Sequence, residues 1–331
     1  MDFRVTEDQA ALMQGIRSFC EGRVSIERLR ELEGTGFDKQ LWQEFAELGV
    51  FALRLPESEG GVDLGMVEAV LVFEELGKAL VPGPLVWSHL AAGLVDGAAT
   101  GETVVGGLDL IGAGGAPYVI EHLEDLDVLL VLREAGVDQI DARAVSGKQV
   151  KTPFDPLTPV SEASELPAGE RIGDAELSAR LRLEGAAVAS GFMLGIAEST
   201  LDLANAYAKQ REQFGRVIGS FQAMKHILAD CYVRQEAARA AAYAAAATYD
   251  DPTVGDVARA ASAAKIVAGE AAMKNARACI QVHGGMGFTW EVPAHYYWKR
   301  TWVYETVFGT VADHADALAE VTSQAAARSV R

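Results

Sequence analysis

The sequence Arg211-Glu-Gln-Phe-Gly-Arg216 interrupts an alanine-rich helical pattern that begins at Leu183. Two further breaks, at Asp251-Pro252 and at His283-Gly-Gly-Met-Gly287, divide the rest of this region. Glycine and proline end helices, because glycine adopts backbone conformations that other residues avoid and proline lacks the amide donor that a helix needs. The pattern therefore predicts four long helices, whose alanine-rich faces permit the close packing of an antiparallel bundle.

Upstream of this region, between about residues 101 and 180, the pattern changes. Short β-branched or alternating runs such as Thr103-Val-Val105 and Asp127-Val-Leu-Leu-Val-Leu132 are separated by clusters of glycine, proline and aspartate. Such runs are typical of strands joined by turns. We therefore expect a small β domain here.

Helical periodicity also fills the N-terminal region, from Thr6 to about His89. Leu12, Ile16 and Phe19 recur at the spacing of one helix face. The predicted fold is therefore α+β but mostly α, in the order helical, β, helical. The expected domains are a helical N-terminal domain at 1–100, a shortened β domain at 101–180 and a four-helix bundle domain at 181–331.

Composition and charge exclude several classes of partner. The chain has 331 residues, with 29 Lys and Arg against 47 Asp and Glu, which gives a formal net charge of −18. No run of five basic residues occurs, and phosphate backbones are bound by clustered Lys and Arg. A nucleic acid is therefore not an expected partner, nor is an anionic membrane surface.

The cysteines and the N-terminus bear on location. Cys20, Cys231 and Cys279 lie far apart without CxxC spacing, which argues against a disulfide framework and a zinc site. The first residues carry charges where a signal peptide needs an apolar core, and no stretch of 18 apolar residues occurs. These features predict a cytoplasmic protein that is not embedded in a membrane.

The sequence lacks the motifs of several enzyme classes. Its six histidines are scattered, and no HxxxH pair, GxSxG elbow or GxxxxGK[ST] loop is present. A lone histidine is more often a hydrogen-bonded polar group than a ligand. We therefore predict no metal site, and neither a hydrolase nor a kinase.

Two segments have residues suited to an anionic ligand. Arg211-Glu-Gln-Phe-Gly-Arg216 combines two guanidinium groups, which suit diphosphate oxygens, with an aromatic ring, which suits a flat heterocycle. Gln281-Val-His-Gly-Gly-Met-Gly287 has bare backbone that a phosphate or an adenine can approach closely. A helix end followed by a turn also requires glycine, so the second segment has a purely structural interpretation as well.

Further motifs run through the whole chain. Those of the first domain are Trp42…Glu47-Leu-Gly49, Leu55-Pro-Glu-Ser-Glu-Gly-Gly61 and Glu74-Glu-Leu-Gly77. Those of the last domain are Arg211-Glu-Gln-Phe-Gly-Arg216, Ser220-Phe-Gln222, Gln281-Val-His-Gly-Gly-Met-Gly-Phe288 and Phe308-Gly-Thr310. With this set, in this order and spacing, the chain resembles the acyl-CoA dehydrogenase family over nearly its whole length.

The resemblance implies a fold, a cofactor and a reaction. Members of the family have the domain order predicted above and bind FAD in a crevice between two subunits of a dimer. They introduce an α,β double bond into an acyl-CoA thioester, with a glutamate that removes the α-proton while hydride moves to the flavin. The residues that match FAD-contacting positions of the family are Arg211, Phe214, Gln222, Gln281, Gly284, Gly285 and Thr310.

The catalytic base of the family has no counterpart at either of its usual positions. Phe308 stands where most members have the Glu of a Glu-Gly-Thr triplet, and phenylalanine cannot accept a proton. The other known position falls at Gly185-Ala186. Glu184 lies one residue earlier, about 100° away around a helix, and is a weak candidate base or else a solvated carboxylate at a helix start. Glu305 is a weaker candidate still.

The β domain departs from the family as well. Active members carry a Thr-Glu-Pro stretch and a Trp-Ile-Thr-like strand that hold the flavin ring, and neither is recognisable here. In the family, the motifs that this chain keeps reach across the dimer to the FAD of the other subunit. The chain thus keeps the part of the site that is given to a partner and has lost the part that it would use itself.

This division predicts a subunit of a heteromeric (α2β2) acyl-CoA dehydrogenase, similar to actinobacterial enzymes that act on steroid-derived CoA thioesters. The subunit would complete the FAD site of a catalytic partner, with an acyl-CoA as substrate and an electron-transfer flavoprotein as the implied electron acceptor. Two alternatives remain open. One is a self-sufficient homodimer that uses Glu184 as its base, and the other is a non-catalytic acyl-CoA-binding scaffold that has lost the flavin.

Overall fold

The computed structural model describes residues 4–112 and 114–329, with side chains up to residue 322. Contacts divide the chain into two compact units. Unit 1 comprises Met1–Gly22, Val70–Leu80 and Ala186–Arg331, and unit 2 comprises Arg23–Ala69 and Val81–Gly185. The three domains expected from the sequence, with boundaries near residues 100 and 180, stay a prediction.

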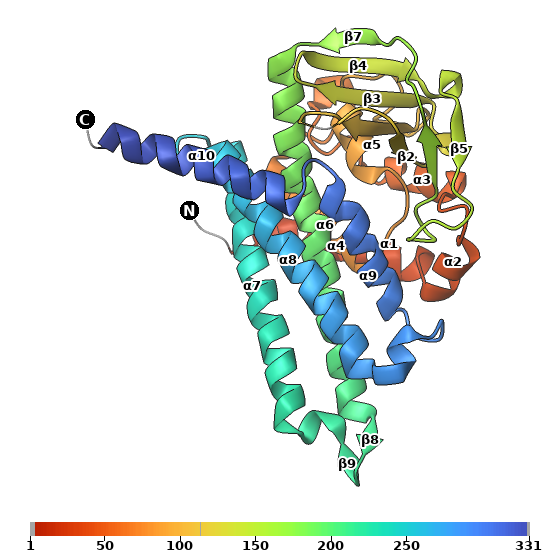
Figure 1. Cartoon of the computed structure of the whole chain (residues 1–331), viewed down its shortest axis with the longest axis vertical. Coiled ribbons are helices and arrows are strands. Elements are labelled where there is room, and N and C mark those ends of the chain that lie inside the picture. The colour runs from red at the N-terminus through yellow and green to blue at the C-terminus, as the bar shows by residue number, and fades with distance from the viewer. Residues whose placement is uncertain (1–3, 113, 330–331) are drawn as a thin grey trace. The chain divides into compact units, whose positions relative to one another are not determined.

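Unit 1 is built from helices, and α8 packs against α7, α9 and α10 (Figure 1). The expected bundle of long helices is confirmed. The helices that contribute to unit 1 are α1 (Glu7–Arg23), α4 (Met66–Lys78), α6 (Ala175–Gln210), α7 (Gln222–Asp250), α8 (Val257–His283), α9 (Ala294–Thr306) and α10 (Val311–Ser329). Its short elements are β8 (Glu212–Gln213), β9 (Arg216–Val217), η4 (Ile218–Ser220) and η5 (Gly284–Phe288).

Glycines bring α4 and α6 into backbone contact. A Cβ atom on Gly195 of α6 would lie 2.0 Å from the carbonyl oxygen of Glu74, and one on Gly77 of α4 would lie 2.0 Å from that of Phe192. Real Cβ atoms do not come this close to a backbone oxygen, so only glycine fits at either position. The two helices therefore meet along a seam that no larger side chain can enter.

Buried charges link three helices of unit 1. Lys78 Nζ on α4 lies 2.8 Å from the carboxylate of Glu198 on α6, and Arg239 on α7 hydrogen-bonds to the same carboxylate. The hydroxyl of Tyr243 donates to Glu74 at 2.7 Å. Burial raises the pKa of Glu74. Because breaking one partner of such a network leaves another charge buried and unpaired, the network fixes the relative positions of α4, α6 and α7.

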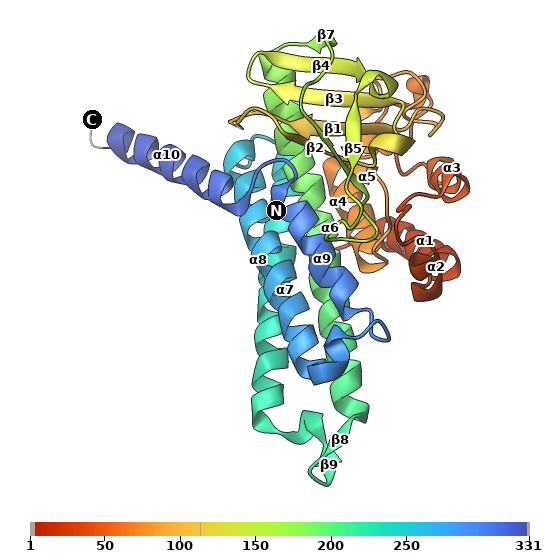
Figure 2. The same ribbon diagram turned by 45° about the vertical axis from the view of Figure 1, so that its right-hand side comes forward.

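Unit 2 combines short helices with two small sheets, visible in Figure 2. This confirms the small β region expected from the sequence. Its helices, apart from the first turns of α6, are α2 (Ile26–Glu31), α3 (Lys39–Glu47), η1 (Glu57–Glu59), α5 (Leu85–Ala91), η2 (Leu123–Asp125) and η3 (Ala142–Ala144). The strands are β1 (Val105–Asp109), β2 (Tyr118–Glu121), β3 (Val128–Arg133), β4 (Gly136–Asp141), β5 (Gly147–Gln149), β6 (Val160–Ala163) and β7 (Glu170–Gly173).

The larger sheet has the strand order β1-β3-β4-β7, and the smaller has the order β2-β6-β5. β1 and β3 pair in parallel, and the other pairs of both sheets are antiparallel. Leu129, Leu130, Val131 and Leu132 of β3 are all fully buried, as expected of a central strand that is covered on both faces. α5 packs on β1, where Ser88 Oγ donates to the carbonyl of Val105 at 2.9 Å.

Within the described part of the chain, α6 is the one helix that is long and apolar enough to cross a membrane. However, 72% of its most apolar window is buried inside the protein. Core helices with this degree of burial pass the same test, so α6 is weak evidence for a membrane span.

We expect Gly195→Ala to destabilise the protein by about 2–3 kcal/mol, because the new methyl group must push apart two helix backbones. Gly15→Ala on α1 is the matched control. A Cβ there meets nothing within 4 Å, and alanine favours helix over glycine by up to ~1 kcal/mol. Denaturant unfolding of both variants measures the effect. A Gly195→Ala variant as stable as the unchanged chain would contradict the backbone contact between α4 and α6.

Protonation of His89 on α5 should make stability pH-dependent. Burial, and then the nearby Arg54 charge, lower the pKa of His89 to about 4. An unfolded histidine has a pKa of about 6.5, so between these values the unfolded state binds the extra proton and stability falls as pH falls. We expect a loss of about 3 kcal/mol from this group between pH 6.5 and 4. Urea unfolding at several pH values measures the free energy of unfolding. Between pH 6.5 and 4 this free energy should fall less steeply with falling pH for His89→Leu than for the unchanged chain.

Candidate functional site

A groove of about 740 Å³ lies in unit 1 where α6, the β8–β9 hairpin, the start of α7 and the end of α8 come together. Five of the seven residues predicted to contact FAD line this groove. Its lining residues are Tyr207, Arg211, Gln213, Phe214, Ile218, Phe221, Ala223, Met224, Gln281, Val282, His283, Gly284, Gly285 and Met286. The two sequence segments suited to an anionic ligand thus face one space, although 64 residues separate the end of the first from the start of the second.

The hairpin presents an aromatic ring to solvent. Phe214 and Gly215 have φ values of 54° and 78° and form the turn between the paired residues Gln213 and Arg216. Such left-handed pairs suit two-residue hairpin turns, but a bulky residue seldom occupies this position. The Phe214 side chain is 92% exposed. Packing within this chain therefore does not explain why a large apolar ring is held here.

Two arginines of the hairpin region have different roles. The guanidinium carbon of Arg216 lies 4.1 Å from the ring centroid of Phe221, so Arg216 stabilises the hairpin by a cation–π contact. Arg211 is exposed, and no described residue forms a salt bridge with its guanidinium group. The amide of Ile218 donates to the Arg211 carbonyl at 2.8 Å and fixes its backbone. Arg211 is therefore available to bind an anionic group.

The glycines after α8 serve different purposes. Gly284 ends α8 with a φ of 61°, and a Cβ on Gly287 would lie 2.6 Å from the carbonyl oxygen of Ile280. Both are required by the local structure. Gly285 has neither a left-handed φ nor any atom within 4 Å of an added Cβ. Its lack of a side chain therefore leaves bare backbone open to a ligand in the groove.

The other two predicted FAD contacts do not line the groove. Gln222 is the exposed first residue of α7, between the lining residues Phe221 and Ala223. Thr310 precedes α10, where its hydroxyl donates to Asp313 at 2.8 Å and accepts from the Asp313 amide. Its position is explained by helix capping.

Sequence reasoning did not assign roles to three apolar lining residues, Tyr207, Phe221 and Met224. Tyr207 lies on α6, four residues before Arg211, whose amide donates to the Tyr207 carbonyl at 2.8 Å, and its ring stacks on that of His283 with centroids 4.3 Å apart. Helical spacing from Arg211 was the available signal for Tyr207. Phe221 lies within the Ser220-Phe-Gln222 motif.

Phe308 lies in the core of unit 1. It is fully buried with a φ of 56°, and its carbonyl accepts a hydrogen bond from His314 Nε2 at 2.9 Å. The buried Lys265 ammonium on α8 donates to the carbonyls of Tyr304 and Gly309, both at 2.9 Å. The loop that carries the base in most of the family is therefore tightly held here, around a side chain that cannot accept a proton.

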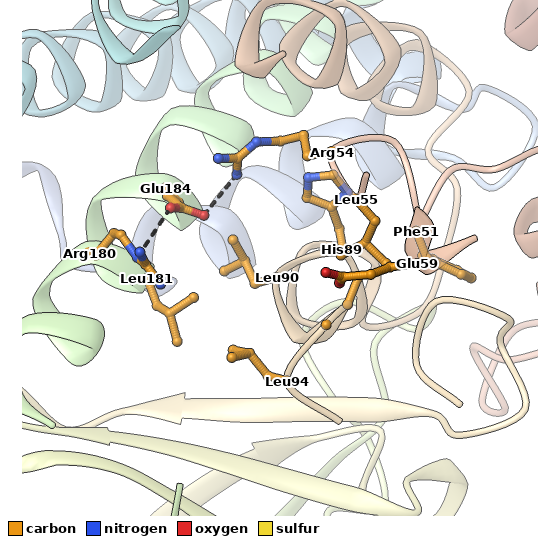
Figure 3. Close-up of a pocket in the computed structure, with 12 residues that line it drawn as sticks. Phe51, Arg54, Leu55, Glu59, His89, Leu90, Leu94, Arg180, Leu181 and Glu184 are labelled. Atoms are coloured by element: carbon orange, nitrogen blue, oxygen red, sulfur yellow. Dashed lines mark hydrogen bonds and ion pairs between the residues drawn. The ribbon is translucent and has the colours of Figure 1, made fainter. Parts of the chain in front are cut away.

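Glu184 lies elsewhere, on the wall of a cavity of about 300 Å³ in unit 2 (Figure 3). Its carboxylate is 2.8 Å from Nη1 of Arg54 and 3.7 Å from Nε of Arg180. The residue is 8% exposed. Glu184 therefore has a structural explanation as the partner of two arginines on the cavity wall. Glu305 accepts from the Val311 amide at 3.3 Å, which is a structural contact.

The groove has the chemistry that the dinucleotide part of FAD requires. An exposed guanidinium suits a diphosphate, an exposed phenyl ring suits a planar heterocycle, and bare backbone at Gly285 permits close approach. The residues present therefore fit part of this cofactor.

Most of the chain matches two domains of one protein family. Residues 6–102 match the acyl-CoA dehydrogenase N-terminal domain, and residues 178–322 match the acyl-CoA dehydrogenase C-terminal domain. Acyl-CoA dehydrogenase IpdE2 of Mycolicibacterium smegmatis is 31% identical to this chain over 312 residues, which cover 89% of this chain and 93% of the relative.

Two solved structures share the fold. The ChsE4-ChsE5 complex from Mycobacterium tuberculosis contains a chain with a TM-score of 0.86 and 24% identity, covering 98% of this chain and 99% of that one. A Tcur3481-Tcur3483 steroid ACAD variant gives a TM-score of 0.85 and 23% identity, with coverage of 98% and 100%. The chain therefore belongs to the acyl-CoA dehydrogenase family, FAD-dependent oxidoreductases that act on the CH–CH bond of acyl-CoA thioesters.

Proposed function

We propose that this chain is the subunit of a heteromeric acyl-CoA dehydrogenase that lacks the catalytic base. It would complete the FAD site of a catalytic partner subunit. The observation that carries the proposal is the contrast between the groove and Phe308. The groove displays Arg211 and Phe214 to solvent, and Phe214 stays 92% exposed although its ring meets Phe221 edge-on. The position expected for the base holds a fully buried phenylalanine.

The pairing of Glu184 supports this proposal over a self-sufficient enzyme. Arg54 and Arg180 both lie beside its carboxylate, so these ion pairs explain the position of Glu184 without a catalytic role. The exposure of Phe214 in the groove supports the proposed subunit over a scaffold without flavin. A scaffold would not require an exposed ring at a left-handed backbone position.

The chain's own residues would bind and orient the cofactor. Arg211 would neutralise diphosphate charge, Phe214 would cover a planar ring, and the backbone at Gly284 and Gly285 would allow close approach. FAD held in this way would supply the acceptor for the hydride of the acyl β-carbon. The base that removes the α-proton would come from the partner subunit, which agrees with the absence of a proton acceptor at Phe308.

The substrate and the electron acceptor belong to the proposal as well. A similar structure is described as a steroid ACAD, which supports a bulky, steroid-derived acyl-CoA as substrate. An electron-transfer flavoprotein is the acceptor expected for this family. The low number of cysteines and their spacing support a cytoplasmic location.

Flavin content tests the proposal directly. We expect the purified chain alone to bind little FAD, because its groove supplies only part of a site. Co-expressed with a partner dehydrogenase from the same genomic neighbourhood, it should form a complex that contains FAD and oxidises an acyl-CoA. Absorbance at the flavin band, divided by the concentration of each chain, gives the measurement. Stoichiometric FAD and acyl-CoA turnover in the isolated chain would contradict it.

Arg211→Gln should weaken FAD binding by the assembled complex by about ten- to a hundredfold, since a hydrogen bond to a charged group contributes about 1.5–3 kcal/mol. Arg277→Gln is the matched control, because Arg277 is also exposed on the bundle but does not line the groove. Dissociation constants from flavin fluorescence titration of the reconstituted complexes compare the two. Equal affinities of both variants would show that Arg211 does not contact the cofactor.

A further inference from the structure

We propose that a small cavity at η2, in unit 2, binds a primary ammonium group. The cavity has a volume of about 180 Å³ and lies where η2, the β5–β6 pair and the turn that follows α2 come together. All of its lining residues belong to unit 2, and they differ from those of the groove and of the cavity beside Glu184. The inference therefore goes beyond the proposed function and needs neither FAD nor a partner subunit.

Two carboxylates on the wall of the η2 cavity have no cation beside them. They belong to Glu124 and Asp125, and no described residue forms a salt bridge or hydrogen bond with either side chain. Besides them, His122 is the one titratable side chain among the lining residues, which include no lysine or arginine. Burial raises the pKa of Asp125 to about 6, with a smaller contribution from the charge of Glu124. The wall therefore attracts a cation.

Asp125 differs in this respect from the rest of the β region. The other aspartates between β1 and β7 each have an arginine or a backbone amide as partner, and they are Asp109, Asp127, Asp138, Asp141 and Asp155. Partly buried carboxylates are costly without such partners. A ligand from outside the chain would give Asp125 the partner that the chain does not provide.

A buried hydroxyl also faces the η2 cavity. Ser161 on β6 is 2% exposed, and no described residue forms a hydrogen bond with its Oγ. Buried hydroxyl groups normally have a hydrogen-bond partner. Ser161 lies opposite Gln149 of β5 in the register of the smaller sheet, and both residues line the cavity. The Ser161 hydroxyl is therefore a second group that a ligand in the cavity can satisfy.

The acceptors and the size of the cavity fit a primary ammonium on a short chain. An ammonium group has three donors and no acceptor, and Glu124, Asp125 and Ser161 all offer oxygen acceptors. The volume lies below the roughly 300 Å³ of sites for drug-sized molecules, so it suits a group of a few heavy atoms. Leu123 and Pro159 are buried on the same wall and provide apolar contact for methylene groups.

An organic cation fits this cavity better than a metal ion. Among the residues that the structure describes, no group of three or more His, Cys, Asp and Glu is placed to hold a metal. The cavity offers two carboxylates, of which Glu124 is exposed, together with a hydroxyl and apolar wall. This combination matches the charged head and the apolar stem of an alkylammonium ion.

Three probes of similar shape and different charge test the assignment on the full-length chain. They are n-butylammonium, the neutral butan-1-ol and the butyrate anion. Backbone amide NMR signals of Asp125 and Ser161 report binding at the cavity, and titration gives the dissociation constants. We expect butylammonium to bind at least about tenfold more tightly than either of the other probes. Equal or tighter binding of butanol or butyrate, or no shift of these amide signals by butylammonium, overturns the proposal.

Charge-removing variants sharpen the test. Asp125→Asn keeps the shape of the side chain and should weaken butylammonium binding about tenfold, because the attracting charge is lost. Glu124→Gln changes an exposed side chain, which leaves the fold intact, and should weaken binding in the same direction.

Glu162→Gln is the matched control. Glu162 is exposed and follows Ser161 on β6, and its side chain points to the opposite face because neighbouring residues of a strand alternate. We expect its affinity for butylammonium to equal that of the unchanged chain. Asp125→Asn and Glu124→Gln variants that both bind as tightly as the Glu162→Gln control overturn the proposal.

Two further probes identify the source of the ammonium group. Primary ammonium groups occur on free amines and on lysine side chains, and Nα-acetyl-lysine methylamide distinguishes them. If it binds as tightly as butylammonium, the cavity admits a lysine of another protein chain, and if only butylammonium binds, the ligand is a free amine. Both results support the proposal. Mg²⁺ that shifts the same amide signals and displaces butylammonium at equal concentration would identify a metal site and overturn it.

Discussion

Backbone contact between α4 and α6 is the constraint on which unit 1 depends. Gly77 and Gly195 each face a carbonyl oxygen of the opposite helix at a distance that excludes any side chain. The close approach brings Lys78 beside Glu198, and Arg239 of α7 then joins the same charge cluster. α6 continues from this seam to Gln210, so the groove at its end is positioned by a helix that is fixed at the seam.

The groove and the loop around Phe308 differ in whether the chain itself provides packing and hydrogen-bonding partners for their side chains. The loop is held by the Lys265 ammonium and His314, which donate to its carbonyls, and its phenylalanine is buried. The groove leaves an aromatic ring and a guanidinium group in solvent. Because native proteins seldom keep a large ring fully exposed at an unfavourable backbone position, the groove is the surface where a cofactor or partner is most needed.

Much of the fold followed from the sequence, because glycine and proline breaks and helical periodicity mark the long helices directly. The break at Phe214-Gly215 became the β8–β9 turn, and the glycine-rich stretch after His283 became the end of α8. That Gln281 and Arg211 line one groove was accessible only through family resemblance. Periodicity says which residues share a helix face, but it does not say which helix ends meet.

The cavity beside Glu184 could not be predicted. Arg54, His89 and Arg180 lie far apart in the sequence, and each alone has an ordinary structural explanation. That they line one cavity is evident only from the tertiary structure. Glu184 was noticed for its place near a family position, yet that reasoning gave no indication of its two arginine partners.

A density map of this chain assembled with its catalytic partner and FAD tests the central claim most directly. The account predicts that Arg211 and Phe214 lie against an FAD whose isoalloxazine ring is enclosed by the partner subunit, with a partner carboxylate beside the acyl α-carbon. An isoalloxazine ring enclosed by this chain's own β region, or a groove that stays empty beside a complete flavin site, would contradict it.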